Sequence, residues 1–118
     1  MLTEYGKAVR KARIELGVTI SQMAKELECS LSYLSAMENG KRPIPMKYVQ
    51  MTEAYFVRMG LCEKLNLKAL ADLSNTCVYL KDLKTDVQNL IVDIAQTELS
   101  DDDVRKMNEI LTNAKNNQ

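Results

Sequence analysis

The chain has 118 residues, of which 46% are hydrophobic and 27% are charged; these values are ordinary for one globular domain with a small appendage. No apolar run approaches the ~18 residues that a membrane-spanning helix needs. The N-terminal segment lacks the apolar stretch of a signal peptide, so a cytoplasmic location without membrane attachment is expected. With no histidine and three widely spaced cysteines, no metal site, cofactor or disulfide framework is expected.

Charge is unevenly distributed, although the formal net charge is zero. Residues 1–60 carry nine basic and six acidic side chains, a net charge of +3. Residues 61–118 carry seven basic and ten acidic side chains, a net charge of −3. A basic first half indicates an anionic ligand for that half, although scattered solvated charges explain the numbers equally well.

The first two helices are predicted from apolar spacing and from their ends. Residues 3–16 have apolar side chains at helical spacing and are followed by Gly17, which suits the left-handed position after a helix. Thr19 and Gln22 have the spacing of a capping box. They predict that a second helix covers residues 20–27.

The remaining elements are also helical in pattern. Ser30 is a good N-cap for a helix over 31–38, which Asn39-Gly40 ends. The only β-like stretch is "TCVYL", which is short enough to be an extended connection. Apolar stripes predict four more helices, over 46–57, 61–73, 84–97 and 101–115. We therefore expect an all-α fold, with a five-helix head over residues 1–74 and a helical extension over 75–118.

Residues 20–38 have the pattern of a helix-turn-helix unit, two short helices joined by a tight turn. On the second helix, Leu34 and Met37 point inward at ~100° per residue. The opposite side is small and partly polar, and it can approach the edges of bases in the DNA major groove. It is formed by Leu31, Ser32, Ser35 and Ala36.

Residues 5–45 resemble the Xre-type helix-turn-helix family, which includes the lambda repressor and the Cro proteins. The residues that carry the resemblance are Ala24 in the first helix of the motif, Cys29 in the turn, Ser30 at the start of the next helix, and the segment "ENGK" over 38–41. The resemblance implies a lambda-repressor-like head that binds double-stranded DNA and regulates transcription without enzymatic activity.

The resemblance also implies roles for single residues. Base contacts are expected from Leu31, Ser32, Ser35 and Ala36. Phosphate contacts are expected from Ser30, Tyr33, Asn39, Lys41 and Arg42. Arg13 and Glu38 match a pair of residues that forms a structural ion pair in relatives.

Two residues depart from the family pattern, and some roles have alternatives. Ile20 stands where the family often has Gln, so one phosphate or base contact is expected either to be lost or to be replaced by Ser21. Glu28 stands where the family often has Gly, which predicts backbone strain at positive φ. Packing or capping is an alternative role for Leu31, and covering the edge of the core is one for Tyr33.

The extension carries more apolar surface than the head needs. We expect residues 76–115 to supply most of a homodimer interface, with intrachain packing as the alternative. The interface residues are predicted to be Val87, Leu90, Ile91, Ile94, Val104, Met107, Ile110 and Leu111.

These patterns favour a homodimeric, sequence-specific transcriptional regulator, and most simply a repressor that binds a palindromic operator. A second hypothesis is an antitoxin, in which the same head binds DNA and the C-terminal region binds a toxin. Polymerase is another protein partner for that region. A third hypothesis is a protein-interaction adaptor that no longer binds DNA, which the neutral total charge and Ile20 favour.

Overall fold

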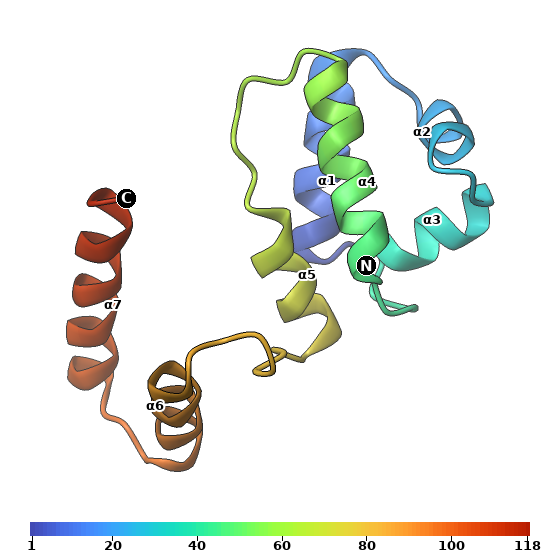
Figure 1. Cartoon of the computed structure of the whole chain (residues 1–118). Coiled ribbons are helices and arrows are strands. Elements are labelled where there is room, and N and C mark those ends of the chain that lie inside the picture. The colour runs from blue at the N-terminus through green and yellow to red at the C-terminus, as the bar shows by residue number, and fades with distance from the viewer. The chain divides into compact units, whose positions relative to one another are not determined.

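The computed structural model describes all 118 residues, and all of its regular elements are helices (Figure 1). The elements, in chain order, are α1 (Glu4–Leu16), α2 (Ile20–Glu26), α3 (Leu31–Glu38), α4 (Met46–Arg58), α5 (Leu67–Asn75), α6 (Thr85–Gln96) and α7 (Asp101–Asn116). The all-α fold predicted from the sequence is confirmed, and the segment 76–80 forms no strand.

The chain divides into two compact units, Met1–Val78 with α1–α5 and Tyr79–Gln118 with α6 and α7. The predicted boundary after residue 74 lies one residue before the end of α5. None of the seven helices combines the length and the apolar character that crossing a membrane requires.

The first unit is held together by contacts between neighbouring helices and between helices that are distant in sequence. α2 packs against α3, α1 packs against both α3 and α5, and α4 packs against α5 (Figure 1). The largest fully buried side chains come from α1, α2, α3, α4, α5 and the turn after α2, and they form one core: Val9, Met23, Leu27, Met37, Val49, Thr52, Phe56 and Leu67.

Helix ends follow the capping chemistry predicted from the sequence. Gly17 has φ of 68° and ends α1 in the left-handed conformation. Thr19 and Gln22 form a capping box at the start of α2, where the Thr19 hydroxyl accepts from the Gln22 amide. The Ser30 side chain accepts from the Tyr33 amide and caps α3.

The predicted helix over 61–73 was wrong at its start. α5 begins at Leu67, because Asn66 adopts a left-handed conformation with φ of 49° that cannot continue a helix. Leu61 and Leu65 lie in the irregular segment before it, but they still pack against the core, which explains their helix-like spacing. The buried face of α5 consists instead of Leu67 and Ala71.

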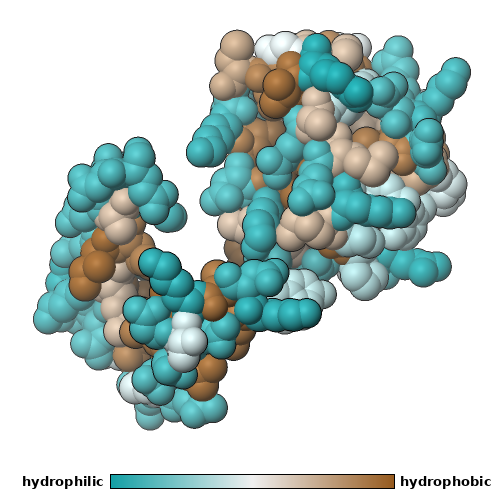
Figure 2. Space-filling view, viewed as in Figure 1, coloured by the Kyte–Doolittle hydropathy of each residue, from teal (hydrophilic) through white to brown (hydrophobic).

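The second unit has no buried residue in either of its helices. Ser100 and Asp103 form the predicted capping box at the start of α7. Figure 2 shows hydrophobic side chains on the surface of this unit between hydrophilic ones. The exposed ones on its helices are Val87, Leu90, Val92, Ile94, Val104, Ile110 and Leu111.

Candidate nucleic-acid interface

Helices α2 and α3 form a helix-turn-helix unit with a four-residue turn over 27–30. Leu27 is buried at the start of the turn, and Cys29 packs against the core from the middle of it. Glu28 has φ of 56°, the left-handed conformation expected from its replacement of a family glycine. Burial raises the pKa of the Cys29 thiol.

Helix α3 has an inner face and an outer face. Leu34, Met37 and Glu38 are buried beneath it. On the outer face, Ser32 is exposed and Leu31 is 46% exposed, so this leucine does not serve mainly as core packing. Ser35 and Ala36 are partly exposed on α3 as well.

The buried end of α3 is fixed by an ion pair with α1. The Arg13 guanidinium donates from Nη1 to Glu38 Oε2 at 2.6 Å and from Nη2 to Glu38 Oε1 at 2.9 Å. Arg13 Nη1 also lies 3.5 Å from the sulfur of Met23 on α2. Arg13 therefore links α1, α2 and α3 beneath the outer face of α3.

The main chain of Glu38 is held by the N-terminal turn of α1. Its carbonyl oxygen accepts from the Thr3 amide at 3.1 Å and from the Thr3 hydroxyl at 3.0 Å. A Cβ atom built on Gly6 would lie 2.2 Å from the same oxygen, so only glycine permits this approach. Neither Thr3 nor Gly6 was identified from the sequence, because their partner is more than 30 residues away.

The loop after α3 presents basic side chains. Gly40 has φ of 74°, and the amides of Lys41 and Arg42 then donate to the carbonyl of Ala36, at 2.9 and 3.3 Å. Both basic side chains are exposed. Asn39, also expected to contact phosphate, donates from Nδ2 to the Ser35 carbonyl at 2.9 Å and caps the helix.

An aromatic pair lies between α3 and α4. The rings of Tyr33 and Tyr48 meet edge to face, with centroids 5.4 Å apart, so half-buried Tyr33 does cover the edge of the core. Lys47 Nζ lies 5.1 Å from the centroid of the Tyr48 ring. Lys47 is an exposed cation in the first turn of α4, two residues after Pro45, and is not among the site residues expected from the sequence.

The remaining predicted site residues lie apart from this group or are already engaged. Ser21 is exposed in the first turn of α2. The hydroxyl of Ser30 caps α3, and its oxygen is therefore already a hydrogen-bond acceptor. The residues predicted for a dimer interface lie in the second unit, where Ile91 and Met107 are half-buried and the other six are exposed.

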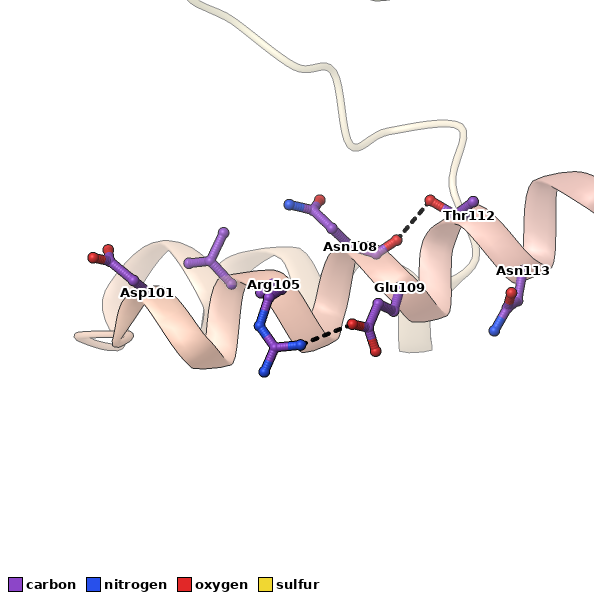
Figure 3. A pocket seen from close by; sticks show the side chains of 7 residues that line it. Asp101, Arg105, Asn108, Glu109, Thr112 and Asn113 are labelled. Carbon is purple, nitrogen blue, oxygen red and sulfur yellow. Dashed lines mark hydrogen bonds and ion pairs between the residues drawn. The ribbon is translucent and has the colours of Figure 1, made fainter.

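No cluster of three or more Cys, Asp or Glu side chains is arranged to hold a metal ion. A hollow on the second unit is lined by residues of α7 alone, including Val104, and Figure 3 shows the Arg105–Glu109 ion pair beside it. A hollow on one face of a single helix has no opposite wall. It therefore encloses no small molecule.

Comparison with known proteins agrees with the geometry of the first unit. Residues 9–56 match the family model described as helix-turn-helix, a span that runs from α1 into α4. A search of the curated proteins and a search of the solved structures found no match. The matched family consists of DNA-binding regulators and is not generally enzymatic. Residues 9–56 are therefore an Xre-like helix-turn-helix domain of the lambda repressor and Cro family, and this domain supports a role for the protein as a DNA-binding transcriptional regulator.

Proposed function

We propose that the protein is a sequence-specific repressor that binds a palindromic operator as a homodimer. The observation that carries the proposal is the outer face of α3, where Leu31 and Ser32 are exposed on a helix fixed from beneath by Arg13 and Glu38. A helix held at its inner face and exposed at its outer face is suited to the major groove.

The proposed contacts divide into base readout and phosphate binding. Ser32 and Ser35 hydroxyls donate to or accept from base edges, and Leu31 and Ala36 contact thymine methyl groups. Lys41 and Arg42 neutralise phosphates beside the groove. Ser21, Ser30 and Tyr33 complete the proposed backbone contacts by donating their hydroxyl hydrogens to phosphate oxygens. Asn39 would make its proposed phosphate contact by turning an Nδ2 hydrogen from Ser35 to the phosphate.

The second unit supports the homodimer. Leu90 and Leu111 are 57% and 55% exposed, and neither α6 nor α7 has a buried residue in the single chain. Exposed apolar stripes on helices are typical of a protein interface. A two-fold dimer would place two α3 helices about 34 Å apart, one turn of the duplex. In the cytoplasm, a dimer bound over a promoter would block the access of polymerase to that promoter.

Selection of duplexes from a random pool tests the DNA-binding part of the proposal. The full chain should enrich an inverted repeat whose half-sites are about 10 base pairs apart, or a multiple of that spacing. Enrichment of a single half-site would support sequence-specific DNA binding but would reject the symmetric dimer. No enrichment would reject sequence-specific binding and favour the adaptor hypothesis.

Light scattering on the full chain tests the interface. Leu90→Asp places a charge in the apolar stripe of α6 and should convert a dimer into a monomer. Asn89→Asp adds the same charge on the neighbouring exposed residue of α6, outside the stripe, and should leave the dimer intact. Equal dimerisation of both variants would place the interface elsewhere.

An antitoxin is the second candidate, favoured by the charge of the unit that carries the exposed stripes. Residues 79–118 hold five basic and eight acidic side chains, a net charge of −3. Such a surface also suits a basic partner protein. A full chain that stays monomeric while still selecting DNA would favour this candidate over the homodimeric repressor.

A further inference from the structure

Asn75, the last residue of α5, brackets the main chain of Ile44 with its side-chain amide. Asn75 Oδ1 accepts from the Ile44 amide at 2.8 Å, and Asn75 Nδ2 donates to the Ile44 carbonyl at 3.0 Å. The two residues are 31 positions apart in the sequence. One side chain thus satisfies both main-chain polar groups of a residue in the connection between α3 and α4.

Ile44 is the one residue of its segment that can be held this way. It lies between Pro43 and Pro45, which have no N–H, so it provides the only main-chain donor of these three residues. Its side chain is buried in the core. The buried side chain of Ile44 fixes the position of this residue. The two hydrogen bonds from Asn75 also fix the orientation of the peptide groups on either side of it.

The bracketed segment joins two groups of exposed cations. Lys41 and Arg42 precede it and are tied to α3 through the carbonyl of Ala36. Lys47 follows it in the first turn of α4. The loop is therefore held at two places, by α3 at Lys41 and Arg42 and by Asn75 at Ile44. These two attachments fix the path of the main chain between the cations.

We propose that Asn75 is a positioning residue for DNA binding, which sets Lys41, Arg42 and Lys47 against the phosphate backbone without touching DNA. This inference rests on the proposed function. Asn75 also precedes Thr76, which ends α5 at φ of 51°. The positioning residue thus lies at the end of the last helix of the first unit, which closes at Val78.

The test measures the affinity of the full chain for the duplex recovered by selection, between about 50 and 200 mM salt. Asn75→Leu removes both hydrogen bonds at similar volume. It should lower affinity about tenfold and make the slope of log K against log salt shallower by about one, the contribution of roughly one phosphate contact. Asn89→Leu, the same change on an exposed surface of α6, should keep the wild-type slope.

A role in folding alone predicts a different pattern. Asn75→Leu would then lower the melting temperature and leave the salt slope of the folded protein unchanged, which would overturn the inference. If Asn75→Leu does not fold, Asn75→Asp decides the question, because it can still accept from the Ile44 amide but cannot donate to the carbonyl. An unchanged slope for Asn75→Asp overturns the inference too. A wild-type chain that binds no duplex refutes the proposed function itself.

Discussion

Arg13 and Glu38 are joined by two hydrogen bonds of 2.6 and 2.9 Å while both side chains are almost completely buried. The pair connects α1 to the last residue of α3, directly beneath the face proposed to meet DNA. Because a buried charge without a partner is costly, each residue makes the other necessary. The orientation of α3 therefore depends on contacts that never reach its outer surface.

Replacement of one partner of this pair should destabilise the protein strongly. Arg13→Met leaves a buried carboxylate without its partner and should lower the free energy of unfolding by about 3–5 kcal/mol. The double variant Arg13→Met, Glu38→Leu removes both charges and should recover most of that loss. Urea denaturation measures both. An equal loss of unfolding free energy in the single and the double variant would show that stability does not depend on the pairing of these two charges.

Gly6→Ala should destabilise the protein, although helix propensity alone favours alanine. The added Cβ would lie 2.2 Å from the Glu38 carbonyl oxygen, a main-chain atom that cannot rotate away. We expect a loss of roughly 1–3 kcal/mol, the usual range for overpacking. Thermal melting with Lys11→Ala as a control on the exposed surface of α1 tests this. A higher melting temperature for Gly6→Ala would contradict the close approach.

Glu28→Gly should stabilise the fold. A non-glycine residue in the left-handed region costs roughly 1–2 kcal/mol, and glycine removes that cost while increasing the entropy of the unfolded chain. A net gain of about 0.5–1 kcal/mol is expected. Glu28→Ala keeps the strain and serves as the control, with little change expected. A higher free energy of unfolding for Glu28→Ala than for Glu28→Gly, measured by chemical denaturation, would refute strain at the turn.

Tyr5 should make stability depend on pH in the alkaline range. Burial raises its pKa from 10.0 to about 12, so the folded state holds the phenolic proton more tightly than the unfolded state. That contribution to stability is fully present below pH 10 and is lost as pH rises from 10 to 12. It amounts to roughly 2–3 kcal/mol.

Comparison with Tyr5→Phe isolates this group from every other effect of high pH on the protein. Unfolding free energies measured across the same range should fall less steeply for Tyr5→Phe than for the wild-type chain. Parallel curves would mean that the Tyr5 hydroxyl does not titrate with folding.

Local signals in the sequence predicted the elements that carry the helix-turn-helix unit. Gly17, Thr19 and Ser30 act through neighbours within three or four residues, so their capping roles follow from spacing. The start of α5 could not be predicted, because Leu61 and Leu65 have helical spacing without forming a helix.

The contacts that fix the site depend on pairs far apart in the chain. Gly6 meets Glu38, and Asn75 meets Ile44, across more than 30 residues. A single sequence has no local pattern that reports such pairs. The ion pair between Arg13 and Glu38 was expected only because the family resemblance supplied it.

The central claim, that the outer face of α3 reads DNA, is tested most directly by the affinity of the full chain for the duplex recovered by selection. Ser32→Glu and Ser35→Glu should reduce binding to the level of an unrelated duplex, because each puts a carboxylate where base edges are proposed to lie. Ala69→Glu adds the same charge on the exposed surface of α5 and should bind within a few-fold of the wild-type chain. Specific binding retained by both serine variants would contradict the claim.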